Sequence, residues 1–520
     1  MRITLVAAAV VCALARLPAA ARERPPSIVL ILADDLGWGD VGFNGRREWR
    51  TPNLDRLARQ GTRFTRWYTA AVVCAPSRAA LLTGRYGIHN GVSGNADDLP
   101  AGEVTLAEAL RARGYATALF GKWHHGSPRP GSDSYVHPMD QGFDEFFGFT
   151  DARHAWEKRP RELWNGRRME PVEGYADTLF ADRAVEFIAR SRDRPFFLYL
   201  PFTNCHFHVE APEEDVARFR GRFPERDPAA PANAHYAAMA ERLDKEVGRV
   251  LEALRRAGIE RDTLVVFSSD HGATFEAGNR GASAFHDSNR PFRGQKRTLW
   301  EGGIRVPGVV RWPVRVPAGR DSDAVVHMID VMPTLLAAAG AAPEPAWGLD
   351  GLNLLPLWTG EAKEPDRTLF WEWRSEGTHQ TAAMRGRMKL VVTRGAPAEL
   401  YDVVADPAER RNLAAEQPDL AASLAKELAA WLETESDASR WGKPDRARPV
   451  PAGRTGARSD PAPSPAEASV SQADLAAGSG GSVRATRQAW PAASLRRSGQ
   501  GPGRGTGASP QRPLGAGRAA

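Results

Sequence analysis

The stretch from Cys74 to Arg85 in this 520-residue chain places a reactive side chain where an anion can bind. Pro76 suits the first turn of a helix, because proline has no N–H to leave unpaired there and its φ is already helical. Gly84 can end that helix in a left-handed conformation. Cys74 would then lie among free backbone N–H groups at the positive end of the helix dipole, and Arg78 would add a permanently charged donor. The pattern predicts a site for an oxyanion, although a lone cysteine near a helix start is more often simply buried.

Acidic residues follow two apolar runs that are typical of buried strands. Asp34 and Asp35 come after the first run, and Asp270 and His271 come after a later one. One such pair at a strand end is often only a solvated turn. Two pairs that converge on the Cys74 helix indicate one divalent cation, and carboxylate oxygens suit a hard ion such as Ca²⁺ or Mg²⁺. The softer nitrogen of His271 leaves the identity of the metal open.

Lysine and histidine side chains follow further apolar runs or lie in a basic loop. They are Lys122, His124, His206, His208 and Lys296. Taken alone, Lys122, His124 and Lys296 are more typical of a solvated surface than of a binding site. For His208 the two interpretations are equally typical. Together these side chains would add positive charge and proton-transfer groups beside the acids.

Short apolar runs alternate with helical patterns along the first 360 residues. The predicted strands are Ser27–Ala33, Tyr115–Phe120, Phe196–Phe202, Thr263–Ser268 and Val306–Val310. The predicted helices are Asn53–Gln60, Leu106–Arg113, Thr178–Ser191, Ala234–Ala257 and Asp330–Ala339. This alternation predicts an α/β fold with a large mixed, mostly parallel sheet sandwiched by helices. Ligands in such folds gather at the carboxyl ends of the strands, where the acids and bases described above are found.

The pattern changes after Gly360. Three short antiparallel strands are predicted at Thr368–Arg374, Ala382–Val392 and Glu399–Val404, and a helix is predicted within 406–433. We therefore divide the chain into a signal peptide (1–21), a main α/β domain (22–365), a smaller C-terminal antiparallel-sheet-plus-helix subdomain (366–438) and a tail (439–520). The tail is rich in Pro, Gly, Ala and Arg and is predicted to be disordered, since it offers too little apolar surface to bury.

The N-terminal residues have the features of a secretory signal. Arg2 precedes an apolar run over Ile3–Leu14, and small residues follow up to Ala21. The run is too short to span a bilayer as a permanent helix. We expect an exported protein (periplasmic, secreted or in a lysosome-like compartment) with no transmembrane segment after cleavage. Cys74 and Cys205 then remain, too few for a disulfide framework.

The net charge of +6 does not describe the folded part of the chain. Residues 441–520 hold 12 Lys and Arg against 4 Asp and Glu, which leaves 57 against 59 in residues 1–440. The basic character belongs to the tail, so it is no argument for a body that binds nucleic acid.

The string that begins at Cys74 matches the signature Cys-x-Pro-Ser-Arg-x-x-x-Leu-Thr-Gly-Arg, and the chain resembles the type I, formylglycine-dependent sulfatases. The layout is similar to the arylsulfatase A and N-acetylgalactosamine-6-sulfatase branch of the alkaline-phosphatase-like superfamily. The block Gly121–His124 and the block Arg293–Pro307 also match, and the resemblance runs from about Ser27 to about Leu413.

The resemblance implies a modified nucleophile and a metal. Cys74 would be oxidised to formylglycine by a formylglycine-generating enzyme, and the hydrated aldehyde would attack sulfur. One Ca²⁺, with Mg²⁺ less expected, would be bound by Asp34, Asp35, Asp270, His271 and residue 74. His271 departs from the Asn of many relatives.

The resemblance also implies the remaining catalytic residues, Arg78, Lys122, His124, His206 and Lys296. Lys122 and Lys296 would bind sulfate, and Lys296 would also contact the leaving oxygen. His124 would hold the second hydroxyl of the hydrate and act as the base. Relatives commonly show Pro-His-Phe-Pro where this chain has Cys205-His206-Phe207-His208, so His206 matches the functional histidine without its flanking prolines. His208 is either a substrate contact or a surface residue.

The sequence therefore predicts a Ca²⁺-dependent enzyme that hydrolyses sulfate esters, with a sulfated sugar of a glycan or an aryl sulfate as substrate. A phosphomonoester or phosphonate ester hydrolase of the same superfamily is the nearest alternative. A catalytically inactive relative that binds sulfated glycans is another. The sugar, the sulfate position, the choice between exo and endo action and the oligomeric state do not follow from the sequence.

Overall fold

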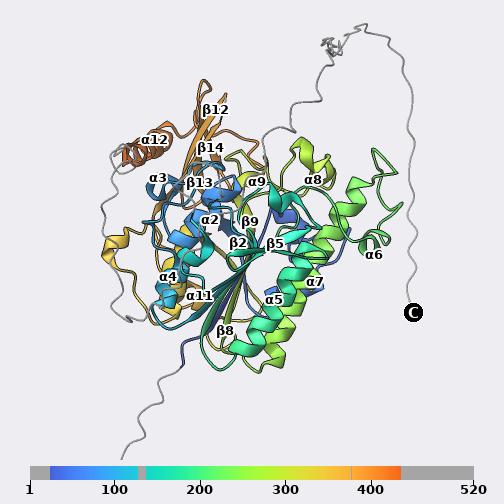
Figure 1. Ribbon diagram of the computed structural model, residues 1–520. Coiled ribbons are helices and arrows are strands. Elements are labelled where there is room, and N and C mark those ends of the chain that lie inside the picture. The colour runs from blue at the N-terminus through green and yellow to red at the C-terminus, as the bar shows by residue number, and fades with distance from the viewer. Residues whose placement is uncertain (1–23, 127–135, 376, 435–520) are drawn as a thin grey trace, which may run out of the picture. The chain divides into compact units, whose positions relative to one another are not determined.

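The computed structural model describes residues 24–126, 136–375 and 377–434. The predicted signal peptide and tail lie outside these ranges. Ten strands form one sheet in the order β10-β2-β9-β8-β1-β7-β3-β4-β5-β6 (Figure 1). Their bounds are β1 Ser27–Ala33, β2 Thr62–Tyr68, β3 Ala116–Lys122, β4 Glu145–Phe149, β5 Glu162–Asn165, β6 Arg168–Pro171, β7 Phe196–Pro201, β8 Thr263–Ser269, β9 Arg305–Arg311 and β10 Arg320–His327.

Five neighbouring strands at the centre of this sheet, β8, β1, β7, β3 and β4, run parallel. In β1, Leu30 lies opposite Tyr199 on one side and Val266 on the other. All seven residues of β1 are buried, as expected for a strand covered on both faces. β9 runs antiparallel to both β2 and β8. The predicted α/β class and the mixed, mostly parallel sheet are confirmed.

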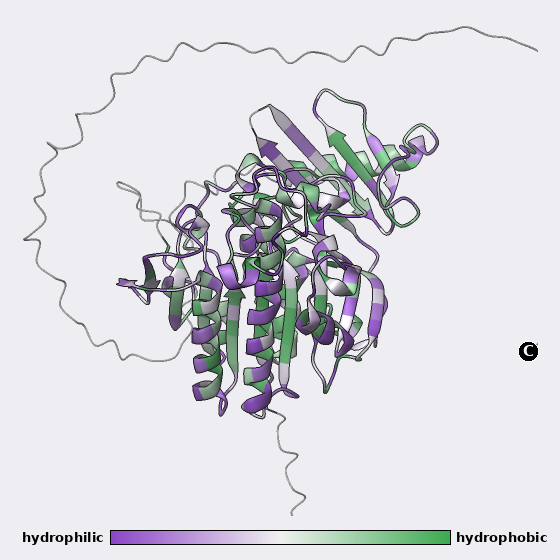
Figure 2. Ribbon diagram, turned by 90° about the vertical axis from the view of Figure 1, so that its right-hand side faces the viewer, coloured by the Kyte–Doolittle hydropathy of each residue, from purple (hydrophilic) through white to green (hydrophobic). Residues whose placement is uncertain are grey.

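Helices cover both faces of the sheet. Their bounds are α1 Pro52–Arg59, α2 Cys74–Thr83, α3 Gly87–Asn90, α4 Leu106–Arg111, α5 Ala176–Ser191, α6 Glu213–Val216, α7 Ala232–Arg256, α8 Ala282–Phe285, α9 Glu301–Ile304, α10 Val331–Ala338, α11 Leu355–Thr359 and α12 Pro418–Glu433. One face packs against α1, α5 and α7, and the other packs against α2, α4, α10 and α11. The strands between them are largely hydrophobic (Figure 2). In the described ranges, no helix has both the length and the apolar character needed to cross a membrane.

A second sheet has four antiparallel strands in the order β11-β12-β13-β14. Their bounds are β11 Thr368–Ser375, β12 Thr378–Arg385, β13 Met388–Thr393 and β14 Glu399–Asp402. The single strand predicted at Ala382–Val392 is wrong, because the chain turns at Gly386, whose φ is +60°, and forms a hairpin. The predicted domain boundary at residue 365 stays a prediction.

The small sheet packs between the large sheet's edge and α12. One of its faces packs, through Trp371, Met384 and Tyr401, in a cluster with β2 and the segment that precedes α2. The other face packs on Leu424 and Leu428 of α12 (Figure 1). The small sheet therefore shares a core with the elements that lead into α2.

A buried charge network joins the small sheet to α9, the short helix that leads into β9. Lys389 Nζ in β13 lies 2.7 Å from Glu301 Oε1 and 2.7 Å from Glu409 Oε1. Glu409 Oε2 also accepts a hydrogen bond from the backbone N–H of Glu301. All three side chains are almost inaccessible to solvent.

We predict that Lys389→Met destabilises the protein by about 3–5 kcal/mol, because it leaves the buried Glu409 without a counter-charge and Glu301 with Arg305 alone. Urea unfolding followed by circular dichroism measures this loss. The exposed Lys426 of α12 supplies the control, since Lys426→Met should change stability by less than about 0.5 kcal/mol. Equal effects of the two substitutions would contradict the role given to the network.

Candidate active site

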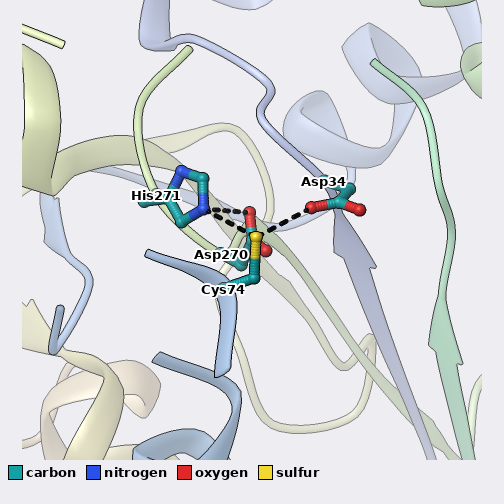
Figure 3. A group of neighbouring side chains, drawn as sticks. All are labelled: Asp34, Cys74, Asp270 and His271. Carbon is teal, nitrogen blue, oxygen red and sulfur yellow. Dashed lines mark hydrogen bonds and ion pairs between the residues drawn. The ribbon is translucent and has the colours of Figure 1, made fainter. Parts of the chain in front are cut away.

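The carboxyl ends of β1 and β8 meet the first residue of α2. Cys74 Sγ lies 3.6 Å from Asp34 Oδ1 and 3.2 Å from His271 Nε2 (Figure 3). Lys296 Nζ approaches the same sulfur to 3.8 Å. Cys74 is only 1% exposed. Residues separated by more than 200 positions in the sequence thus surround one sulfur atom.

The start of α2 is set by local backbone geometry. Val73 is extended, with φ −145° and ψ 159°, and the helix begins at Cys74. Asn95 Oδ1 accepts the N–H of Ala75, one of the donors that a helix start leaves unpaired. The predicted left-handed end at Gly84 is confirmed by its φ of +67°. Because every residue of α2 is buried, the helix holds Cys74 rigidly.

The acids are held in place by the strand ladder and by one another. Asp270 N donates to Ala33 O, which extends the pairing of β1 with β8 by one residue. Asp35 has a φ of +57°, and its N–H donates to Asp270 Oδ1 over 3.1 Å. Ligand atoms of Asp34, Cys74, Asp270 and His271 all lie within 4.8 Å of one another (Figure 3). Three buried carboxylates and an imidazole nitrogen form a donor set that fits a divalent cation.

Two basic residues compensate Asp34 and Asp270. Lys122 Nζ lies 2.8 Å from Asp34 Oδ2. Arg78 Nη2 lies 2.8 Å from Asp270 Oδ2 and 3.2 Å from Asp34 Oδ1. Burial by itself raises the pKa of Asp34, but the nearby cations, Lys122 foremost, outweigh it and hold that pKa well below its usual range. Asp34 is therefore ionised at neutral pH.

Asp35 is less well compensated. Lys296 Nζ lies 3.0 Å from Asp35 Oδ1, and His206 Nε2 lies 3.8 Å from Asp35 Oδ2. Burial raises the pKa of Asp35, and Lys296 does not fully offset that effect. Burial would lower the pKa of Lys296, but Asp35 outweighs it and raises the pKa above its usual value. The negative charge of Asp35 is therefore not fully balanced, and an additional cation beside it would be favourable.

The predicted histidines occupy different environments. His124 is 7% exposed, and its Nδ1 has no hydrogen-bond partner among the described residues. Burial, and after it Lys122, lower the pKa of His124 well below its usual range, so the ring is neutral. His206 Nδ1 lies 2.7 Å from Phe207 O. His208 is exposed, and its ring lies beside Trp156 and Phe207.

The structure thus brings nearly all the predicted site residues into one buried centre and leaves out His208. The residues in that centre are Asp34, Asp35, Cys74, Arg78, Lys122, His206, Asp270, His271 and Lys296, with His124 beside them. Sequence reasoning missed Asn95 at the start of α2 and Asp177 and Lys158 beside the His206 loop. Of these, only Asp177 carried a signal, as an acid directly before the predicted helix Thr178–Ser191.

Comparison with protein-family models gives two matches. A model described as Sulfatase matches residues 26–341, and one described as N-sulphoglucosamine sulphohydrolase, C-terminal, matches residues 293–437. Among curated proteins, N-acetylgalactosamine-6-sulfatase of Canis lupus familiaris is 37% identical over 69% of this chain and 70% of its own length. Steryl-sulfatase of Mus musculus is 32% identical over 77% of this chain and 80% of its own length.

Two solved structures bear on the alternatives. The structure of Ps i-CgsB in complex with k-i-k-neocarrahexaose has a TM-score of 0.71 and 30% identity, and it covers 78% of this chain and 93% of that one. Phosphonate monoester hydrolase of Agrobacterium radiobacter has a TM-score of 0.58 and 23% identity, and it covers 79% of this chain and 96% of that one. The second likeness shows a shared fold alone.

We predict that Cys74, in molecules where residue 74 is still a cysteine, resists iodoacetamide at pH 8 when the protein is folded. Burial raises the pKa of Cys74, and the thiolate is the form that reacts. Mass analysis of the peptide that contains Cys74 should show alkylation only in a urea-unfolded sample, which serves as the control. Rapid labelling of the folded protein would contradict the burial and the charge state described above.

Proposed function

The chain belongs to the sulfatase family and is a sulfuric ester hydrolase, and we propose that it removes sulfate from a sugar of a sulfated glycan with residue 74 in its formylglycine form. One observation carries this proposal. A helix-start cysteine, three carboxylates and three cationic side chains from separate elements meet in a single buried centre. Such a centre can bind an anion and stabilise the negative charge that develops on it during the reaction.

We assign sulfate binding to Arg78, Lys122, His206 and Lys296. A sulfate monoester carries one negative charge, so donors fixed in a dry pocket stabilise the charge that develops at sulfur, which is usually the largest catalytic effect. Lys122 and Lys296 now pair with Asp34 and Asp35. With a cation held by those carboxylates, the two ammonium groups would be available to the sulfate.

Formylglycine at residue 74 would supply, as its hydrate, a hydroxyl that takes the sulfuryl group from the ester oxygen. Deprotonation of the second hydroxyl would then re-form the aldehyde as the bond from carbon to the sulfated oxygen breaks and sulfate leaves. A buried thiol with a raised pKa is a poor nucleophile, and this supports the proposal that residue 74 acts as formylglycine and not as cysteine. We assign the proton transfer to His124, because its ring is neutral and its Nδ1 has no hydrogen-bond partner among the residues that the structure describes. Conversion of Cys74 by a formylglycine-generating enzyme and export through the signal peptide are parts of the same proposal.

We propose Ca²⁺ as the metal. Asp34, Asp35, Asp270 and His271, with residue 74, would hold it, since Ca²⁺ accepts several oxygen ligands in a flexible geometry. When bound, the cation supplies positive charge at residue 74 and lowers the pKa of a hydroxyl there. His271 contributes the one nitrogen donor of the set.

The substrate assignment rests on the relatives. N-acetylgalactosamine-6-sulfatase is named for a sulfated sugar, and Ps i-CgsB was crystallised with a carrahexaose. Steryl-sulfatase is named for a different class of ester, so an aryl or steryl sulfate is the second candidate. Sulfate release from a panel of sulfated mono- and oligosaccharides, with steryl sulfate included, decides between them.

We predict that the wild-type protein releases sulfate from 4-nitrophenyl sulfate faster than phosphate from 4-nitrophenyl phosphate in a Ca²⁺ buffer. Cys74→Ala should lower sulfate release to the background of the assay, because the nucleophile is lost. Mass analysis of the peptide around residue 74 gives the fraction converted in each preparation. Faster phosphate release, or activity of protein whose Cys74 is wholly unmodified, would overturn the proposal.

We predict that Ca²⁺ raises the melting temperature of EDTA-treated protein by a few degrees, because a ligand that binds only the folded state stabilises it. Asp270→Asn should lose this response, since it removes a charged ligand. Asp244→Asn is the matched control, because Asp244 is also a buried carboxylate but accepts hydrogen bonds from Asn53 and Leu54, in α1. A response of equal size in both variants would contradict the proposed site.

A further inference from the structure

The loop that carries His206, residues 203–206, is held by a carboxylate outside the proposed catalytic set. Asp177, in the first turn of α5, accepts three hydrogen bonds and is fully buried. Its Oδ1 accepts from Thr203 N over 2.8 Å and from Thr203 Oγ1 over 2.9 Å. Its Oδ2 accepts from Asn204 N over 3.1 Å. An ionised carboxylate accepts and does not donate, so all three bonds fit the charged form of Asp177.

A buried lysine holds the same loop through its carbonyl group. Lys158 is 1% exposed, and its Nζ donates to Thr203 O over 2.7 Å. Thr203 O also accepts the backbone N–H of His206 over 3.1 Å. Burial lowers the pKa of Lys158 to about 8, which leaves the ammonium group charged at neutral pH. Lys158 and Asp177 thus bind opposite ends of one peptide group with opposite charges.

The next residue of the loop, Asn204, connects the backbone held by Asp177 and Lys158 to Asp34. Asn204 Oδ1 lies 2.7 Å from the hydroxyl of Tyr175, and Asn204 Nδ2 donates to Met239 O. Asn204 O accepts the backbone N–H of Asp34. The loop is therefore fixed on all sides over the two residues that precede Cys205 and His206.

We propose that Asp177, together with Lys158, is a positioning residue for His206 in sulfate ester hydrolysis. Cys205 and His208 stand where relatives commonly have the two prolines that flank the His-Phe pair. In this chain, charged hydrogen bonds from α5 and from Lys158 fix the backbone that prolines would otherwise restrict. The inference rests on the proposed function, because it assigns His206 to the sulfate.

A double-mutant cycle tests the proposal. Asp177→Asn keeps the shape of the side chain but turns an amide N–H₂ or a neutral oxygen toward donors that need an acceptor. We expect kcat/KM for 4-nitrophenyl sulfate to fall by about 10–100-fold, the usual cost of a misplaced catalytic group. In a His206→Ala background the same substitution should change kcat/KM by less than about twofold, because the group that it positions is gone.

The kinetic pattern separates positioning from a loss of folded enzyme. Partial unfolding lowers the amount of active protein, so it lowers the apparent kcat and leaves KM unchanged. The loss of kcat/KM in Asp177→Asn should instead divide between kcat and KM in the same way as the loss in His206→Ala. Asp244→Asn, the matched buried carboxylate, should lower the melting temperature but leave kcat/KM within about twofold of wild type.

Further variants and controls keep the outcome clear. If Asp177→Asn does not fold, Tyr175→Phe removes the hydroxyl that donates to Asn204 in the same loop. Its loss of kcat/KM should likewise disappear in the His206→Ala background. A loss that persists in the His206→Ala background assigns the effect to Asp34 or to general stability and overturns the proposal. Wild-type protein with a converted residue 74 but no sulfate release refutes the proposed function itself, which is a distinct result.

Discussion

The structure depends on the burial of three carboxylates in one centre. Ionised acids cannot be placed away from water unless cations and hydrogen-bond donors replace it. Arg78, Lys122 and Lys296 supply that compensation, and each of them comes from a different segment of the chain. Because both the acids and the cations are almost inaccessible, the charges act at low dielectric, where their effect on a bound anion is strongest.

The fold meets this requirement by bringing the carboxyl ends of strands and the start of a helix together. Parallel strands place the residues after β1 and β8 side by side, and the start of α2 faces them. The small sheet takes part as well. Trp371 Nε1 donates to Thr69 O, and Gln380 Oε1 accepts the N–H of Leu299, close to the segment that holds Lys296. The C-terminal sheet thus supports two of the segments that form the centre.

The same cations serve two states of the centre. Without substrate they neutralise the acids, and in the proposed function they hold the sulfate. His206 belongs to this arrangement through its loop, whose backbone is bound by Asp177 on one side and Lys158 on the other. Such a loop has little freedom, so the catalytic geometry does not have to be created when the substrate arrives.

The sequence alone determined the features that depend on local order. The apolar run of β1, the helix start at Cys74 and the left-handed residue Gly84 are set by neighbours along the chain, and the family signature spans only twelve residues. The hairpin at Gly386 was missed, since two short strands and a brief turn read as one apolar run. Only the tertiary structure decided which cation pairs with which acid, and that Asp177 and Lys158, 26 and 45 positions from Thr203, hold the His206 loop. Those contacts depend on how the helices pack on the sheet, and no spacing in the sequence encodes them.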